Sequence, residues 1–276
     1  MAEHWILAID SGNSRVKFGL FRHQTNQLFH EPVEFIANDL QSPLPVELLR
    51  QWWRRAETGG SAGLHSIAGG SNPKALDCLL AEWPGAAGNS MSTPDFWPRP
   101  HVVRSGLELP LAIDVEAPER VGLDRLFNAV AGNTIRRPDQ PALLIDAGTA
   151  TTIDWLDAQG RFCGGAILPG IELGARALHQ YTALLPLVSR QELSAPHPSS
   201  IGRNTRAAMS SGLYWGHVGA IRELSSRMST ETEPPVMLLT GGSAGILADE
   251  FPEARHIPAL GLWGMILSLP QLRQST

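Results

Sequence analysis

Residues 10–17 combine an acidic side chain, a basic side chain and a turn of small polar residues in one short stretch. Residues 11–14, with the sequence Ser-Gly-Asn-Ser, have little side-chain bulk, so their backbone N–H groups can close on an anion such as a nucleotide phosphate. The carboxylate of Asp10 repels phosphates unless a divalent cation, normally Mg²⁺, lies between them. Lys17 supplies a positive charge to the same phosphates. The stretch therefore indicates either a phosphate-binding hairpin or an ordinary exposed one.

The same pattern returns about half the chain later, in residues 142–156. An apolar segment leads into Asp146, then a turn of small residues that includes Thr149, then a second strand-like segment. One short motif of this kind matches by accident. Two copies at corresponding places in the two halves of the chain predict duplicated domains with a nucleotide in the cleft between them.

An acid and a base adjoin at the start of a helix predicted within residues 121–130. The apolar residues of this segment are spaced to face a core. Asp124 is favoured near a helix N-terminus by the macrodipole and by capping, and this explanation needs no chemistry. The alternative is that Arg125 clamps a substrate carboxylate while Asp124 serves as a base.

Two segments in the last third of the chain are further candidates for ligand binding. Residues 201–205 lead into a long helix that reaches about Met228, and Asn204 or Thr205 is a candidate cap for it. Residues 236–240 read as a buried strand that runs into Gly241 and Gly242. Glycines at that point let an adenine ring or a phosphate approach the backbone, and a plain strand-to-helix turn is the alternative.

Strands and helices must hold these groups in place. Residues 5–21 read as strand, turn and strand, in which Val16, Phe18 and Leu20 point to one side while Arg15 and Lys17 point to the other. Further strands are expected at 28–36, 64–68 and 102–103, further helices at 46–56, 73–82 and 171–178, and a long surface loop at 84–100. A new unit is expected to begin near Pro118, which gives domains of residues 1–117 and 118–276.

Composition and charge exclude several classes of protein. The 276 residues are 43% apolar and 18% charged, as in globular proteins. The formal net charge of -5 argues against nucleic-acid binding. The sequence has no apolar run long enough to span a bilayer and no signal pattern at its start, so we expect a cytoplasmic protein. Cys78 and Cys163 are far apart and are expected to be buried small hydrophobes, not a disulfide or zinc ligands.

The order of these motifs resembles the type III pantothenate kinases. The resemblance runs from Ile6 to Ala244, and residues 122–169 are its most specific part. It implies an α/β fold with two ribonuclease-H-like domains of the actin, sugar kinase and heat-shock chaperone superfamily, which bind ATP in the cleft between them. It also implies the activity of that family, the ATP-dependent phosphorylation of the terminal hydroxyl of pantothenate, which is the first step toward coenzyme A.

The resemblance also implies roles for individual residues. The residues similar to the first phosphate loop are Asp10, Ser11, Gly12, Asn13, Ser14, Arg15, Val16 and Lys17, with Asp10 near Mg²⁺ through water. Thr149 resembles an ATP contact in the second loop, and Asp146 resembles the ligand of a monovalent cation, K⁺ or NH₄⁺. The residues similar to the pantothenate-binding segment are Gly122, Leu123, Asp124 and Arg125, with Asp124 the proposed base and Arg125 the carboxylate partner. Thr205 matches a further substrate contact.

The family is usually dimeric, so the resemblance implies a homodimer. This chain departs from the pattern at Val115, where many relatives carry a tyrosine that contacts substrate. One alternative is a kinase of the same superfamily that acts on another small carboxylate-bearing alcohol. Another is a non-catalytic regulatory or accessory protein that retains the fold.

Overall fold

The computed structural model describes residues 4–23, 31–58, 64–84, 99–194, 197–229 and 233–270. The chain forms two compact units. The first comprises Met1–Leu111, Glu116–Ile135 and Ala259–Thr276, and the second comprises Ala112–Val115 and Arg136–Pro258. Each unit is built on one five-stranded sheet.

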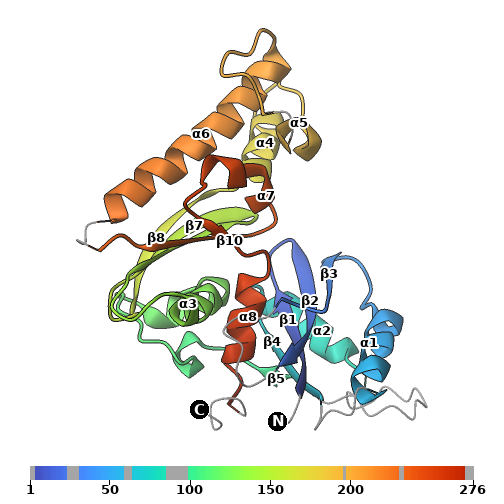
Figure 1. The fold of residues 1–276 in the computed structure, drawn as a ribbon. Coiled ribbons are helices and arrows are strands. Elements are labelled where there is room, and N and C mark those ends of the chain that lie inside the picture. The colour runs from blue at the N-terminus through green and yellow to red at the C-terminus, as the bar shows by residue number, and fades with distance from the viewer. Residues whose placement is uncertain are drawn as a thin grey trace. The chain divides into compact units, whose positions relative to one another are not determined.

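The sheet of the first unit has the strand order β3-β2-β1-β4-β5. Its strands are β1 (His4–Ser11), β2 (Arg15–His23), β3 (Glu34–Asp39), β4 (Leu64–Gly69) and β5 (His101–Val102), and its helices are α1 (Val46–Thr58), α2 (Pro73–Glu82), η1 (Gly106–Glu108), η2 (Pro118–Arg120), α3 (Leu123–Ile135) and α8 (Leu260–Leu267). β1 pairs antiparallel with β2 and parallel with β4. Figure 1 labels the five strands and the α-helices of this unit and colours them in order along the chain.

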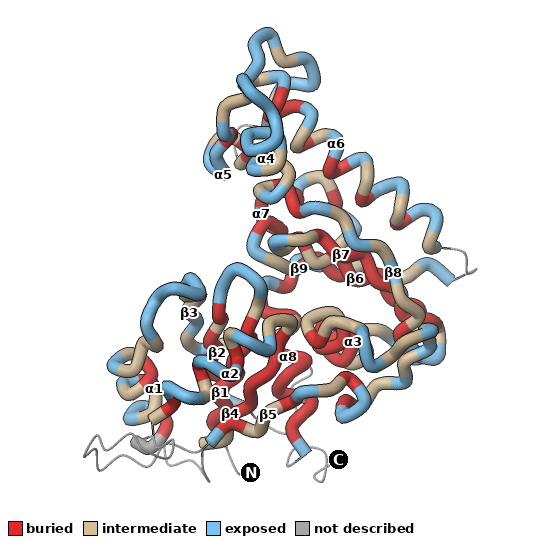
Figure 2. Tube along the Cα trace, turned by 180° about the vertical axis from the view of Figure 1, so that it is seen from behind, coloured by how far each residue is buried: buried red, intermediate tan, exposed pale blue. Residues whose placement is uncertain are grey.

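The two faces of this sheet carry different helices. Alternate residues of β1, such as Leu7 and Ile9, pack with Leu49 of α1 and Leu76 of α2 in one buried core. The opposite face contacts α8, which packs along α3 and β1. Gly264 of α8 lies so close to α3 that a Cβ atom there would be 1.8 Å from a backbone oxygen of α3. Figure 2 shows the buried stretches along β1, β4 and α8.

The sheet of the second unit has the order β10-β9-β6-β7-β8. Its strands are β6 (Ala142–Ala147), β7 (Ala150–Leu156), β8 (Phe162–Pro169), β9 (Val236–Thr240) and β10 (Arg255–His256), and its helices are α4 (Ile171–Gln180), α5 (Arg190–Ser194), α6 (Thr205–Met228), α7 (Ala244–Leu247) and η3 (Ala248–Glu250). Leu143 and Ile145 of β6 pack with Ala175 of α4 and Val218 of α6. Helices α4 and α6 therefore cover one face of this sheet.

The two sheets have the same topology. In each, the first strand of a hairpin pairs antiparallel with the second strand and parallel with the strand that follows the next helical segment. The opening hairpin β1–β2 thus corresponds to β6–β7, and β4 corresponds to β9. The duplication predicted from the two similar hairpins is present as a repeated sheet.

The limits of the units differ from the two consecutive domains of residues 1–117 and 118–276. Helices α3 and α8 both follow residue 118, and α8 lies near the end of the chain, yet their contacts place both in the first unit. Their close approach at Gly264, and the contact of α8 with β1, are the physical reason. The segment Ala112–Val115 belongs to the second unit because it hydrogen-bonds to the start of β8.

Most predicted elements are present, and some lie elsewhere. The strand expected at 28–36 is β3, Glu34–Asp39, and residues 28–30 lie outside the described residues. Most of the expected loop at 84–100 also lies outside them.

Cys78 is exposed, so its predicted burial is wrong, because it points away from the face of α2 that buries Leu76 and Leu79. Cys163 is half-buried. Among the described helices, none has both the length and the apolar character needed to cross a bilayer.

Candidate functional site

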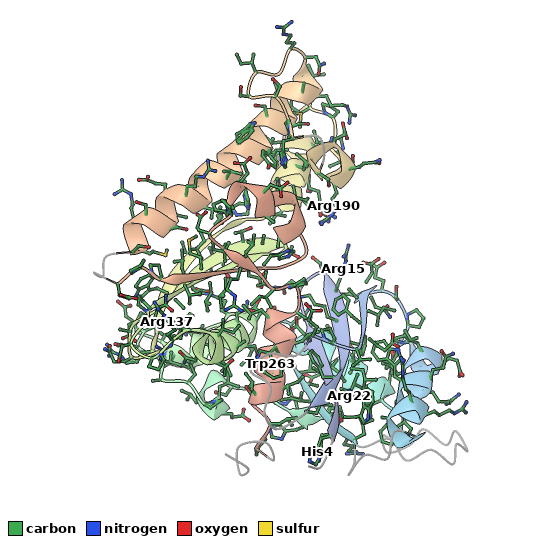
Figure 3. All side chains as sticks on the ribbon, viewed as in Figure 1. His4, Arg15, Arg22, Arg137, Arg190 and Trp263 are labelled. Carbon is green, nitrogen blue, oxygen red and sulfur yellow. The ribbon has the colours of Figure 1, made fainter. Side chains whose placement is uncertain are left out.

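The turn between β1 and β2 brings Asp10 and Lys17 together. The two residues are directly opposite in the antiparallel pair, and Lys17 Nζ lies 3.2 Å from Asp10 Oδ2. The backbone N–H of Gly12 donates to Arg15 O at 3.0 Å and closes the turn. Arg15 lies at the start of β2, next to this turn (Figure 3). Because side chains alternate along a strand, Asp10 and Lys17 are on the sheet face that carries α8, as the sequence predicts for Lys17.

The buried carboxylate of Asp10 has one oxygen, Oδ1, with no hydrogen-bond partner among the described groups. A buried carboxylate oxygen without a partner is costly. A cation or one of its water ligands would satisfy this oxygen, since hard cations such as Mg²⁺ take oxygen ligands. The residues present therefore fit the expected Mg²⁺, with Asp10 as the group that would hold it.

A second turn, between β4 and α2, fixes the first one. The Ser11 hydroxyl donates to Asn72 O at 3.0 Å, and the Asn72 N–H donates to Ser11 O at 2.9 Å. Gly70 has φ +136° and lies so close that a Cβ atom would be 2.4 Å from Ser11 O. Sequence reasoning missed this turn. Its signals are the Gly69-Gly70 pair after a strand and the Asn72 cap, which accepts from Ala75 N–H at 3.1 Å.

Asp124 and Arg125 lie in the first turn of α3, in the same unit as Asp10 and Lys17. Phe127, one turn further along, packs over Gly69 at the end of β4, where a Cβ atom would be 3.0 Å from its ring. Residues three apart share a helix face, so Asp124 is on the side of α3 that meets this sheet. The Arg125 N–H donates to Asp124 Oδ1 at 3.0 Å.

Gly122 completes this segment. A Cβ atom at Gly122 would lie 2.6 Å from Asp124 Oδ1, so a glycine leaves room for the carboxylate. Leu123, the residue between them, is buried and anchors the helix start in the core. Asp124 and Arg125 are both half-buried and so keep some access to solvent.

The second unit gathers three turns around Asp146 and Thr149. Gly170, which precedes α4, donates from its N–H to Thr149 O at 3.1 Å, and the Ser243 N–H donates to Ala147 O at 2.8 Å. A Cβ atom at Gly241, which has φ +97°, would lie 2.4 Å from Asp146 Oδ1. The turns after β6, β8 and β9 are thus joined by hydrogen bonds and close packing.

Asp146 has threonines on both sides in the sheet. It is directly opposite Thr152 on β7 and Thr240 on β9, so the three side chains share one face. The Thr152 hydroxyl is buried and, among the described groups, has no hydrogen-bond partner. A carboxylate with a neighbouring hydroxyl oxygen provides ligands suited to a hard cation, so these residues fit the expected monovalent cation. No cluster of three or more His, Cys, Asp or Glu side chains occurs in the described part of the chain.

A buried histidine supports the same hairpin from α6. The His217 imidazole Nε2 lies 3.0 Å from Thr151 Oγ1, and both side chains are buried. Burial lowers the pKa of His217, because the imidazolium form would lose its hydration. The neutral ring therefore pairs with the hydroxyl two residues after Thr149.

Thr205 is exposed at the first position of α6. The cap of this helix is Asn204, whose Oδ1 accepts from Ala207 N–H at 2.8 Å, so the hydroxyl of Thr205 is not needed as a cap. Val115 lies beside β8, where a Cβ atom at Gly164 would be 3.5 Å from Val115 Cγ1.

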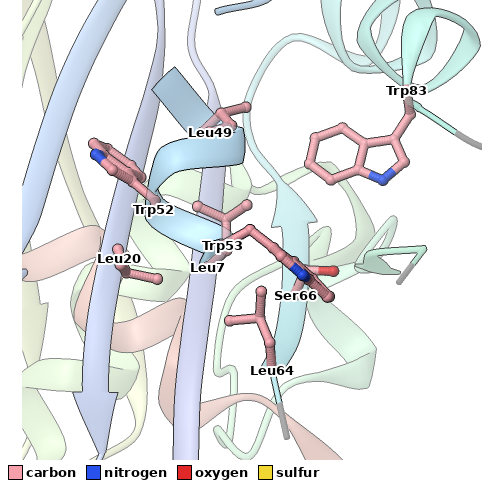
Figure 4. Close-up of a pocket in the computed structure, with 8 residues that line it drawn as sticks. All are labelled: Leu7, Leu20, Leu49, Trp52, Trp53, Leu64, Ser66 and Trp83. Atoms are coloured by element: carbon pink, nitrogen blue, oxygen red, sulfur yellow. The ribbon is translucent and has the colours of Figure 1, made fainter. Parts of the chain in front are cut away.

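A pocket in the first unit lies apart from these turns (Figure 4). Its lining residues come from β1, β2, β4, α1 and the end of α2, and they are Leu7, Leu20, Leu49, Trp52, Trp53, Leu64, Ser66 and Trp83. None of these eight residues is charged. The pocket is therefore unsuited to phosphates or to a carboxylate, and it is a gap in the apolar core between α1 and the sheet.

Comparisons with solved structures identify the class of fold. The chain is 18% identical to a putative Baf family transcriptional activator from Campylobacter jejuni, with a TM-score of 0.57 over 97% of this chain and 99% of that one. It is 12% identical to the activator of 2-hydroxyisocaproyl-CoA dehydratase from Clostridium difficile with bound ADPNP, with a TM-score of 0.53 over 98% and 96%. At these identities the likeness concerns the fold alone. The repeated sheets and these neighbours define a protein with two ribonuclease-H-like domains of the actin-like ATPase fold.

Sequence comparisons identify the family. A family model described as type III pantothenate kinase matches residues 6–227. The type III pantothenate kinase of Geotalea uraniireducens is 32% identical over 89% of this chain and 90% of its own length. That of an Exiguobacterium species is 41% identical over 60% of this chain, and the alignment spans 63% of that relative. The chain belongs to the type III pantothenate kinase family.

Proposed function

We propose that this chain transfers the γ-phosphoryl group of ATP to the terminal hydroxyl of pantothenate, which yields 4'-phosphopantothenate for coenzyme A synthesis in the cytoplasm. The observation that carries the proposal is the Asp10–Lys17 pair at the end of β1, beside Gly69 of β4, over which Phe127 of the helix that carries Asp124 packs. This grouping supplies a metal-binding carboxylate, a cation for phosphates and a second carboxylate that is available as a base. Membership of the family supports the choice of substrate.

Phosphoryl transfer needs an aligned nucleophile and neutralised charge more than covalent help from the protein. In the proposed reaction, Asp124 accepts the proton of the pantothenate hydroxyl. The hydroxyl oxygen forms a bond to the γ-phosphorus, and the bond from that phosphorus to the oxygen that leaves with ADP breaks. Arg125 binds the pantothenate carboxylate as a charge-assisted pair, and Thr205 is a further substrate contact.

The proposed ATP contacts are the two matched turns. The backbone N–H groups of residues 11–16, with Lys17, bind phosphate oxygens, and Thr149 contributes from the second turn. Gly241 and Gly242 allow the nucleotide to approach the backbone after β9. Mg²⁺ held through Asp10 supplies charge neutralisation when bound. Asp146, with Thr152 beside it, would hold K⁺ or NH₄⁺.

The proposal includes a homodimer. Several large apolar side chains of the second unit are exposed around α4, α5 and the start of α6. They are Leu173, Leu178, Tyr181, Leu184, Leu187 and Ile201, and we call them the α4–α6 apolar surface. Exposed apolar patches of this kind mark sites of protein association. A second copy of this chain is the proposed occupant, as the family resemblance implies.

A coupled assay of ADP release with pantothenate, run with and without K⁺, tests this function. We expect Asp124→Asn to retain the fold and nucleotide binding and to lose about 10²-fold or more in kcat, the scale of a general base. Asp139→Asn is the matched control, because Asp139 is exposed in a turn at φ 59°, where asparagine is tolerated.

The outcomes separate the alternatives. Near-normal turnover by Asp124→Asn would remove Asp124 from the mechanism. Turnover with another hydroxy acid but not with pantothenate would indicate a different acceptor. Binding of nucleotide without turnover of any acceptor would indicate a regulatory or accessory protein.

A further inference from the structure

Arg190, at the start of α5 (Figure 3), contacts the turn after β9 and the first turn of α4. Its guanidinium donates to Glu172 Oε1 at 2.5 Å, to Ser243 Oγ at 3.3 Å and to the carbonyl oxygen of Gly242. Glu172 lies in the first turn of α4, and the other two partners lie in the turn after β9. One planar side chain therefore ties the turn after β9 to α4, a geometry that the several fixed donors of arginine suit.

The position of Arg190 is itself fixed by α5. Glu192 accepts from the Ser189 N–H at 2.8 Å and from Arg206 Nη1 at 2.8 Å, and these hydrogen bonds lower the pKa of Glu192 to about 2. Leu193 is fully buried in the core of the second unit. The short helix is thus anchored on both sides, so its first residue is held toward the Gly242 carbonyl.

The turn that Arg190 contacts is also bonded to the second phosphate turn. The Ser243 N–H donates to Ala147 O at 2.8 Å, and Gly241 packs against Asp146. Gly241 has φ +97°, and a Cβ atom added at Gly242 would have no atom within 4 Å. These two glycines have no side chains that could pack and fix the turn. The Arg190 guanidinium therefore adds side-chain hydrogen bonds to a turn that is otherwise held through its backbone and through Gly241.

We propose that Arg190 is a positioning residue for nucleotide binding, which fixes the Gly241–Gly242 turn through the Gly242 carbonyl and the Ser243 hydroxyl. This inference rests on the proposed function, because it takes that turn as a nucleotide contact. Its effect is confined to the nucleotide, since Arg190 acts on the turn after β9 and not on Asp124, Arg125 or Thr205.

The test measures binding of a non-hydrolysable ATP analogue by calorimetry, together with KM for each substrate. We expect Arg190→Ala to weaken analogue binding by about tenfold, equivalent to about 1.4 kcal/mol. KM for ATP should rise by a similar factor, while kcat and KM for pantothenate stay within about twofold, because a loss of ground-state binding alone raises KM. Glu172→Gln, which leaves the contacts with Gly242 and Ser243, should give a smaller effect in the same direction.

The controls distinguish positioning from general damage. Arg227→Ala removes an exposed arginine that pairs with Glu223 at 2.6 Å on α6, and it should change neither binding nor KM. Guanidinium chloride, well below the unfolding transition, should restore part of the affinity to Arg190→Ala and none to Glu172→Gln. Unchanged analogue binding by folded Arg190→Ala, or equal changes in both KM values, would overturn the inference. A wild-type protein that binds no analogue would instead refute the proposed function on which it depends.

Discussion

Replacement of Gly70 by alanine should disturb the turn at residues 11–14, which we propose binds phosphate, more than an added methyl group at the neighbouring Gly12 or Gly69. Gly70 has φ +136°, a conformation that side chains rarely adopt. The new Cβ atom would be 2.4 Å from Ser11 O and 2.6 Å from Ser11 N, whereas ordinary contact begins near 3.4 Å. Ser11 or Gly70 must therefore move by about 1 Å, the difference between 3.4 and 2.4 Å.

The size of the effect follows from two separate costs. A non-glycine residue in this backbone region costs about 1–3 kcal/mol, and overpacking costs a similar amount. A shift of the backbone relieves part of both costs, so they do not add in full. We therefore expect the free energy of unfolding to fall by about 2–4 kcal/mol. A displacement of about 1 Å at a binding group can cost about 10²-fold in rate, so kcat/KM for ATP should fall on that scale.

Urea unfolding and binding of a non-hydrolysable ATP analogue measure the two effects separately. Gly212→Ala is the matched control, because Gly212 lies within α6 and has nothing within 4 Å of its Cβ position. That variant should be more stable by about 0.5–1 kcal/mol, since alanine is favoured over glycine in a helix. If Gly70→Ala matched the wild type in both unfolding and analogue binding, the packing of the β4–α2 turn against Ser11 would not position the proposed phosphate turn at residues 11–14.

Two further predictions concern the second unit. Because burial lowers the pKa of His217, the unfolded state takes up a proton near pH 6.5 that the folded state does not, so wild-type stability should fall as the pH drops from 7.5 to 5.5. In urea unfolding, the free energy of unfolding of His217→Gln should depend less on pH than that of the wild type. An equal dependence would show that the buried His217 is not its cause. On the α4–α6 apolar surface, Leu184 is 90% exposed. A charge there should prevent association, so we expect Leu184→Glu to be a monomer when its mass is measured by light scattering. A wild-type protein that is itself a monomer would refute the proposed dimer.

The elements next to the site could be predicted because their signals are local. The predicted helices at 73–82 and after residue 204 are present as α2 and α6, and Asn204, one of the two candidate caps of α6, accepts the backbone hydrogen bond from Ala207. The alternation of Val16, Phe18 and Leu20 places Lys17 on the opposite face, beside Asp10. Neighbours in sequence determine these features, so no knowledge of the tertiary fold is needed.

Contacts between distant segments could not be predicted in this way. Ser11 and Asn72 are separated by 61 residues, and Arg190 and Gly242 by 52. Their pairing depends on which strands become parallel neighbours, and a single sequence does not specify that pairing. The same limit explains the domain boundary, because the packing of α8 on α3 joins the end of the chain to the first unit.

The duplicated hairpins also show why similar motifs need not do the same chemistry. Asp10 and Asp146 occupy equivalent positions, each at the end of the central strand of its sheet. The residue opposite Asp10 is Lys17, which offsets the negative charge, whereas the residue opposite Asp146 is Thr152, which adds a neutral oxygen. A lysine in this position favours phosphate oxygens, and a hydroxyl favours a cation. The difference of one cross-strand partner therefore fits the proposal of Mg²⁺ and phosphate at the first turn and of a monovalent cation beside Asp146, a role that the family resemblance implies.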